Sequence, residues 1–335
     1  MKSKRLGRTG LRVSEVCLGT MTFGRQADEV TSFKIMDTAA EGGVNFFDTA
    51  DVYPIPVTEE TKGRTEEIVG KWLKGKRDKF ILATKCRAQM GPLPWNQGLS
   101  RKHILQAVED SLRRLQTDYI DLYQTHSPDA ETPIDETLHA LDSLVTSGKV
   151  RYIGCSNYGA WRLAEALWTS DKLGLARYDC VQPRYNLLFR QIEDELLTVC
   201  SEQGVGVIAY NPLAGGFLTG KFKQDAPPEP GSRFDLMKEG QSLYHERYWK
   251  AAQFSTVENL ANYFESRKIP LAQAAIAWVL SNPVITSAIV GASKPEQLVG
   301  TLPSVDLTLS DEDREVCNAA WFNIPRPMDP TVALR

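Results

Sequence analysis

The chain has 335 residues, of which 42% are hydrophobic and 24% charged, and a formal net charge of −3. This composition is typical of a globular protein with a large core, and the length suits two ordinary domains or one α/β barrel. The weak negative charge and the absence of a sustained basic stripe argue against a nucleic-acid or anionic-membrane partner. Since neither an apolar leader nor a run of about 18 apolar residues is present, we expect a cytoplasmic protein without a membrane partner. Composition does not predict an oligomeric state.

The elements follow a regular order along the chain. The first 13 residues predict a small β-hairpin, and eight short apolar runs follow, each typical of a strand. These runs lie at 15–19, 44–48, 79–85, 119–126, 150–157, 180–182, 205–210 and 287–291. Segments with helical period lie between most of them, for example 28–43, 100–116 and 134–148.

The segment 100–116 has the clearest helical pattern. Ser100 suits the N-cap, and apolar residues recur at i, i+3 and i+4 along one face. These residues are Ile104, Leu105, Val108, Leu112 and Leu115. The segment 134–148 ends on Gly148, a residue common at helix C-termini.

Apolar strands that alternate with helices predict a parallel sheet covered on its outer side. Eight such units indicate an α/β protein of the (β/α)8 TIM-barrel type, forming a single domain over 1–335, with a doubly wound sheet as the alternative. Residues 211–250, after the seventh strand, are too many for a simple loop and predict an active-site flap. We expect a last helix at 310–320 and a tail at 326–335.

Three consecutive strands end in polar residues, namely Asp48, Lys85 and His126, and Tyr53 follows Asp48 on the next loop. The C-terminal ends of barrel strands form the active-site face, so these four side chains should meet at one mouth. Taken singly, each has an ordinary explanation as a turn residue, a solvated lysine or a satisfied histidine. Their joint placement favours a catalytic site.

The four groups suit the reduction of a carbonyl. A phenol has an ordinary pKa of about 10, and the Lys85 cation would favour the phenolate while Asp48 holds the ammonium in place. His126 could donate a hydrogen bond to the carbonyl oxygen. We find no activated Ser or Cys nucleophile, and six widely spaced cysteines without metal-ligand spacing predict buried reduced thiols and no metal site.

Two glycine-rich stretches are similar to nucleotide-binding motifs, but their neighbouring residues do not match those motifs. The stretch GVGVIA at 204–209 precedes a strand, whereas a dinucleotide fingerprint follows one and opens a helix. The stretch GGFLTGKF at 215–222 approaches a phosphate-binding loop, but Phe222 replaces the Ser or Thr that would hold magnesium. Neither motif supports a nucleoside triphosphatase.

The chain resembles the aldo-keto reductase superfamily over nearly its whole length. The resemblance is carried by RLGRTGLRVSEVCLGTMTFG, GGVNFFDTADVY, SLRRLQTDYIDLYQTHSPD, VRYIGCSNY, YNPLAGGFLTGK and VGASKPEQL, in this order. It implies a (β/α)8 barrel that reduces a small aldehyde or ketone substrate with NADPH. Tyr53 would be the proton donor, Lys85 and Asp48 its tuning pair, and His126 the group that orients the carbonyl.

The resemblance also implies where NADPH binds. Ser156, Asn157 and Gln182 would hold the nicotinamide carboxamide, and Tyr210 would stack on the ring. A covering loop, the 2′-phosphate site and the adenine contact complete the set. The remaining residues implied in cofactor binding are Thr20, Met21, Asp48, Asn211, Leu213, Gly215, Gly216, Lys221, Arg233, Gly291, Ser293, Lys294 and Gln297. Ser293 and Lys294 are placed like family residues that bind the 2′-phosphate, and Gln297 like an adenine contact.

Some features leave alternatives open. Gly300 and Thr301 replace the Glu-Asn pair with which many relatives contact adenine. The loops at 54–64 and 91–98 would shape the substrate pocket, and we expect Trp95 to line it. The chain also resembles the potassium-channel β subunits, so a redox-sensing regulatory subunit is an alternative function. Those subunits lack a histidine at the position of His126, which favours turnover here. Another carbonyl reaction, such as a sugar 2-keto step, is a third possibility.

Overall fold

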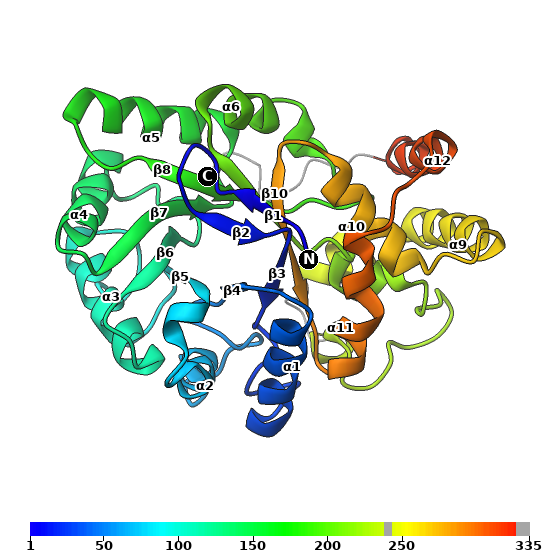
Figure 1. Cartoon of the computed structure of the whole chain (residues 1–335), viewed down its shortest axis with the longest axis horizontal. Coiled ribbons are helices and arrows are strands. Elements are labelled where there is room, and N and C mark those ends of the chain that lie inside the picture. Colours follow the sequence, from blue (N-terminus) through cyan, green and yellow to red (C-terminus); the bar gives the residue numbers. More distant parts are fainter. Residues whose placement is uncertain (238–242, 326–335) are drawn as a thin grey trace.

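The computed structural model describes residues 1–237 and 243–325 and shows a closed barrel of eight parallel strands (Figure 1). In order around the barrel the strands are β10 (Ile285–Gly291), β3 (Val16–Gly19), β4 (Phe46–Asp48), β5 (Ile81–Cys86), β6 (Ile120–Thr125), β7 (Val150–Ser156), β8 (Tyr178–Gln182) and β9 (Gly206–Tyr210). All eight predicted strands are present. Closure of the ring excludes the doubly wound sheet and confirms the predicted barrel.

The helices lie outside the strands and complete the βα order (Figure 1). Those between successive strands from β3 to β9 are α1 (Glu29–Glu41), α2 (Arg64–Leu73), η1 (Arg77–Lys79), α3 (Arg101–Leu115), α4 (Ile134–Thr146), α5 (Ala160–Leu173), η2 (Gln191–Glu193) and α6 (Leu196–Gln203). Those after β9 are η3 (Ala214–Thr219), α7 (Arg233–Leu236), α8 (Leu243–Tyr248), α9 (Ala251–Ser266) and α10 (Leu271–Ser281). Those after β10 are α11 (Pro295–Thr301), η4 (Leu302–Val305) and α12 (Asp311–Phe322).

Local sequence explains the helix boundaries. The Ser100 hydroxyl accepts a hydrogen bond from the backbone amide of His103 at 3.3 Å, which makes Ser100 the N-cap of α3 as predicted. Ile104, Val108 and Leu115 on α3 are fully buried against the barrel. The periodic apolar face therefore decides which side of the helix faces the strands.

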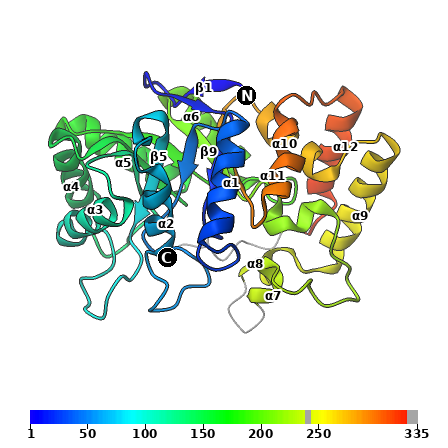
Figure 2. The ribbon, with the colours of Figure 1, turned by 60° about the horizontal axis from the view of Figure 1, so that its bottom comes forward.

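The hairpin of β1 (Ser3–Arg5) and β2 (Arg12–Ser14) closes one end of the barrel. Leu6 and Val13 are completely buried and pack against the apolar residues of the barrel interior. Figure 2 shows this hairpin at one end of the barrel and α7 and α8 at the opposite end. The apolar side chains of the hairpin thus close one end of the barrel interior, and α7 and α8 lie at the other end.

The predicted flap after β9 contains η3, α7 and α8, and its residues 238–242 lie outside the description. Phe217, Phe234 and Tyr248 within it are buried in a cluster of aromatic rings, with 5.7 Å between the ring centres of Phe217 and Phe234. Aromatic packing of this kind holds the segment against the body of the protein. The predicted tail at 326–335 also lies outside the described residues.

None of the helices in the described ranges is both long and apolar enough to cross a bilayer. The six cysteines all fall within the described ranges and are buried free thiols.

Candidate active site

The inward direction of the polar side chains in the site is explained by the alternation of side chains along the strands. Phe46, Ala83 and Leu122 point into the barrel and belong to one apolar interior cluster. Since side chains alternate between the two faces of a strand, residues two positions further on also point inward. On β4, β5 and β6 these residues are Asp48, Lys85 and Gln124. A polar layer therefore lies directly above the apolar layer, at the C-terminal end of the barrel.

Asp48 and Lys85 form a buried ion pair. The Lys85 ammonium nitrogen lies 2.5 Å from Asp48 Oδ2 and 2.8 Å from the carbonyl oxygen of Thr49, and both side chains are almost completely buried. Asp48 therefore faces Lys85 across the interior, as predicted. A buried pair of this kind is stable only when hydrogen bonds satisfy its remaining lone pairs.

Two amides supply those hydrogen bonds. Gln182 Nε2 donates to Asp48 Oδ1 at 2.8 Å, and Gln124 Nε2 donates to the same oxygen at 3.2 Å. Gln182, which the resemblance places at the nicotinamide carboxamide, thus also holds Asp48. Gln124 was missed in the sequence, although its position two residues after the inward-facing Leu122 marks it as a member of the polar layer.

Tyr53 and His126 lie next to this ion pair. Their ring centres are 5.7 Å apart at an interplanar angle of 77°, and both rings are partly buried. The Lys85 nitrogen is 5.3 Å from the centre of the Tyr53 ring. The fold therefore brings together a phenol, an imidazole, an ammonium and a carboxylate from four separate segments, as predicted.

The electrostatic surroundings of Tyr53 differ from the prediction. Burial raises the pKa of Tyr53 well above its ordinary value, and the negative charge of Asp48 raises it further, whereas Arg233 lowers it. We expected the Lys85 cation to favour the phenolate. The negative charge of Asp48, 2.5 Å from Lys85, offsets this effect, and the effect of burial prevails. Tyr53 therefore keeps its proton at neutral pH.

Burial also determines the charge of His126. Loss of hydration lowers the pKa of His126 to about 3, and the cations Lys85 and Arg87 contribute to the decrease. The imidazole is therefore neutral at physiological pH. A neutral imidazole can still donate one hydrogen bond.

These side chains lie at the base of a cavity of about 590 Å³. Tyr53, His126 and every residue predicted to bind the cofactor line it, whereas Lys85 lies buried beneath. The cofactor residues that line it are Thr20, Met21, Asp48, Ser156, Asn157, Gln182, Tyr210, Asn211, Leu213, Gly215, Gly216, Lys221, Arg233, Gly291, Ser293, Lys294 and Gln297. Gly300 and Thr301, which depart from the family pattern, line it as well.

Hydrogen bonds order one end of the cavity. The Tyr210 hydroxyl donates to Asn157 Oδ1 at 2.9 Å, and Asn157 Nδ2 donates to the carbonyl oxygen of His126 at 2.9 Å. The Ser156 hydroxyl donates to the carbonyl oxygen of Gln182 at 2.8 Å. Tyr210, Asn157 and His126 are thus connected across three strand ends, which fixes the Tyr210 ring at the wall.

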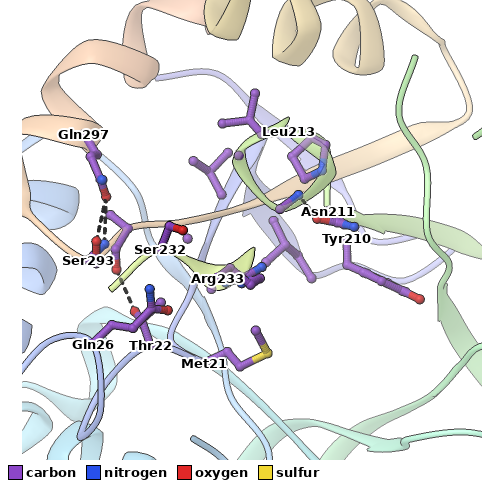
Figure 3. Close-up of a pocket in the computed structure, with 18 of the residues that line it drawn as sticks. Met21, Thr22, Gln26, Tyr210, Asn211, Leu213, Ser232, Arg233, Ser293 and Gln297 are labelled. Atoms are coloured by element: carbon purple, nitrogen blue, oxygen red, sulfur yellow. Dashed lines mark hydrogen bonds between the residues drawn. The ribbon is translucent and has the colours of Figure 1, made fainter. Parts of the chain in front are cut away.

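The other end carries Ser293 and Gln297, joined by a hydrogen bond of 2.8 Å from the Ser293 amide to Gln297 Oε1. Figure 3 shows Gln297 and Ser293 on one side of the view, Tyr210 on the other, and Arg233 between them. Lys221 and Lys294 also line the cavity. A long cavity with an aromatic ring at one end and three cations along its walls suits an anionic dinucleotide.

The segment before α7 closes over this cavity. Gln26 Nε2 donates to the carbonyl oxygen of Gly231 at 2.9 Å, and Lys221 forms an ion pair with Glu229 at 2.7 Å. Residues 229–233 all line the cavity. Gln26 and Tyr244 are further lining residues that were missed, since no local pattern distinguishes them from ordinary loop residues.

Trp95 does not line the cavity, contrary to the prediction. It is about half exposed and borders a separate surface depression, with the Lys102 nitrogen 5.9 Å from its ring centre. The 91–98 loop therefore places Trp95 against α3. Within the described ranges, no cluster of three or more His, Cys, Asp or Glu residues could hold a metal ion.

The chain is similar to known proteins over most of its length. The family model "Aldo/keto reductase family" matches residues 15–321. The "Uncharacterized oxidoreductase YrpG" of Bacillus subtilis is 40% identical over 95% of each chain. The "Probable voltage-gated potassium channel subunit beta" of Arabidopsis thaliana is 37% identical over 92% of each chain, and "Protein tas" of Escherichia coli is 36% identical over 93% of this chain and 95% of its own.

Proposed function

Since the chain belongs to the aldo/keto reductase family, we propose that it is an NADPH-dependent oxidoreductase that reduces an aldehyde or ketone to an alcohol. One observation carries the proposal. The phenol of Tyr53 and the neutral imidazole of His126 lie side by side at the base of a dinucleotide-sized cavity, directly above the Asp48–Lys85 ion pair. This arrangement suits proton donation to an oxygen that becomes negative.

The residues of the chain have distinct roles in this reaction. Bound NADPH supplies a hydride to the carbonyl carbon. The neutral imidazole of His126 donates a hydrogen bond to the carbonyl oxygen and orients it. The Tyr53 O–H bond breaks as its proton moves to that oxygen, which leaves an alcohol and a phenolate. Lys85, 5.3 Å from the ring centre, stabilises the phenolate until it regains a proton from solvent.

Asp48, Gln124 and Gln182 keep Lys85 in position. Without Asp48 the ammonium would be an isolated buried charge, which is strongly unfavourable. The two amides fix the orientation of the carboxylate, and Gln182 also faces the cavity. These three residues therefore act on the reaction mainly through Lys85.

The preference for NADPH over NADH is part of the proposal. The 2′-phosphate would bind at Ser293 and Lys294, and Lys221 and Arg233 would contact the diphosphate. Tyr210 would stack on the nicotinamide, with Asn157 and Ser156 at its carboxamide. Charge-assisted hydrogen bonds to phosphate are stronger than neutral ones, so a cation at the 2′-phosphate position favours NADPH, which carries this additional phosphate, over NADH.

The alternative function is a regulatory subunit that binds NADPH with little turnover. The potassium channel subunit relative, 37% identical over almost the full chain, makes this a specific possibility. The presence of His126 beside Tyr53 favours turnover. NADPH consumption measured over aldehydes, ketones and sugars separates the two functions, because a regulatory subunit would show little substrate-dependent oxidation with any of them.

Tyr53→Phe tests the proton donor. We expect kcat to fall at least about a hundredfold, because general acid catalysis contributes roughly that much or more. The affinity for NADPH, measured by fluorescence titration, should change little. Tyr263→Phe, which removes a hydroxyl bonded to Asp313 outside the site, is the control and should keep full turnover. Unchanged kcat in Tyr53→Phe would exclude Tyr53 as the donor.

A further inference from the structure

Arg87 lies directly after β5, at the end of the barrel that carries the candidate catalytic residues. It follows the last residue of β5, and the register of β5 and β6 pairs Lys85 with Gln124 and Cys86 with Thr125. The amide of His126 donates to the carbonyl oxygen of Cys86 at 2.9 Å. Arg87 and His126 are therefore the next residues after two adjacent strands at the C-terminal end of the barrel, where His126 lines the cavity and Arg87 lies beside it, outside the lining.

The Arg87 side chain is anchored at one nitrogen only. Its Nε donates to the carbonyl oxygen of Pro128 at 2.9 Å, and the side chain is partly exposed. Among the described residues, its two terminal nitrogens have no hydrogen-bond or ion-pair partner. A guanidinium that is fixed at Nε presents its two terminal N–H groups as a fork, the geometry that suits a carboxylate or phosphate.

Nearby acidic groups are engaged elsewhere. Asp129 lies close enough for Arg87 to lower its pKa, yet its oxygens accept hydrogen bonds from the amides of Leu99 and Glu131 and from the Thr132 hydroxyl. The other neighbouring cation, Lys85, is paired with Asp48. Arg87 therefore brings a positive charge close to His126 without forming an ion pair with Asp129, and this charge contributes, together with Lys85, to the low pKa of that imidazole.

The backbone of Arg87 is strained. Its φ of 138° lies in a region that favours glycine, and its carbonyl oxygen accepts a hydrogen bond from the amide of Gly98 at 2.9 Å. Strained residues that the surrounding structure imposes are concentrated at functional sites. The strained backbone of Arg87 therefore agrees with a functional role for this residue.

We propose that Arg87 binds an anionic group of the substrate, so that the preferred carbonyl compounds carry a carboxylate or phosphate. This rests on the proposed function, because it assumes that the carbonyl lies between Tyr53 and His126. Neutral carbonyl compounds would lack the interaction with the guanidinium fork. The specificity of the site would thus depend on a residue outside the catalytic group.

The test compares pairs of compounds that differ in charge. The first pair is 3-formylbenzoate and its neutral analogue 3-formylbenzamide, and the second is glyceraldehyde phosphate and glyceraldehyde, which distinguishes phosphate from carboxylate. We measure kcat/KM with NADPH, and binding of the same compounds to the NADPH-loaded protein by calorimetry. The variants are Arg87→Met, Arg87→Lys and, as a matched control, Arg151→Met, which removes an arginine at the start of β7.

We expect the wild type to favour the anionic member of at least one pair, and the ratio of kcat/KM values for anion and neutral analogue to fall on the order of tenfold in Arg87→Met. The loss should appear in KM and be partly restored by Arg87→Lys, with no change in Arg151→Met. An equal loss for both members of each pair, or no anion preference in turnover and calorimetry, would overturn the proposal. Absent turnover together with Arg87-dependent anion binding would contradict the proposed reduction while supporting this anion site.

Discussion

The carboxylate of Asp48 receives hydrogen bonds from three side chains that come from three other strands. Lys85, Gln124 and Gln182 all donate to it, and none of the four is more than slightly exposed. At the scale of single residues, the site therefore depends on one buried anion and its donors. Removing either member of the ion pair leaves the other charge buried without a partner.

Lys85→Met should lower the free energy of unfolding by about 3 to 5 kcal/mol, because Asp48 becomes an unpaired buried charge. Urea denaturation measures the change. Arg113→Met, which breaks an exposed ion pair with Asp110, is the control and should cost less than about 1 kcal/mol. If Lys85→Met and Arg113→Met cost the same, the buried pair does not stabilise the fold as described.

The pH dependence of activity should reflect a neutral His126. The pKa of His126 is about 3 and that of Tyr53 is raised, so neither group titrates between about pH 5 and pH 8. We therefore expect kcat/KM for a neutral substrate to stay constant over this range. In the unfolded chain His126 has its ordinary pKa of about 6.5. Its contribution to stability is therefore complete above pH 6.5 and is lost as the pH falls toward 3. An acid limb near pH 6.5 that disappears in His126→Asn would contradict this.

At the scale of elements, the segment between β9 and α9 decides how the cavity is closed. Its aromatic residues pack against the body of the protein, and Gln26, on the loop after β3, holds the segment through the Gly231 carbonyl. Contacts of this kind affect how quickly a ligand leaves more than how it is recognised.

Gln26→Ala should accelerate NADPH dissociation by roughly three- to tenfold, the equivalent of one hydrogen bond. Stopped-flow fluorescence with a chase of unlabelled NADP measures the rate. Gln203→Ala, at the C-terminus of α6 and outside the cavity, is the control. An unchanged dissociation rate in Gln26→Ala would show that the contact with Gly231 does not retain the cofactor.

At the scale of the whole molecule, one closed barrel supports all parts of the site. The apolar hairpin plug seals one end, and the polar layer and the cavity occupy the other. Because residues on β3, β4, β7, β8, β9 and β10 line one cavity, a ligand that binds there is linked to the stability of the entire barrel.

NADPH at about a hundred times its dissociation constant should raise Tm by roughly 4 °C, from a stabilisation of about 2.7 kcal/mol on a chain of this length. Thermal unfolding with NADPH and with NADH at equal concentrations measures the preference. Lys294→Met should reduce the shift with NADPH and leave the shift with NADH unaltered. Equal shifts for both cofactors in the wild type would contradict the 2′-phosphate assignment of Lys294.

Much of this molecule could be predicted from the sequence. The eight strands were predicted because residues that are buried on both faces of a strand must be apolar, and Asp48 and His126 were found because they interrupt those runs at strand ends. Trp95 was placed wrongly because a loop residue has no periodicity to direct it. Gln124 was missed because its role depends on Asp48, 76 positions away in the chain.

The order of strands and helices, the polar strand ends and the chemical groups available can all be predicted from the chain, because periodicity and residue type are local properties. The folded arrangement is needed to establish that Asp48 pairs with Lys85, that burial raises the pKa of Tyr53 and lowers that of His126, and that the terminal nitrogens of Arg87 have no partner among the described residues. These properties depend on through-space distance and on the exclusion of water, and both arise when the barrel closes.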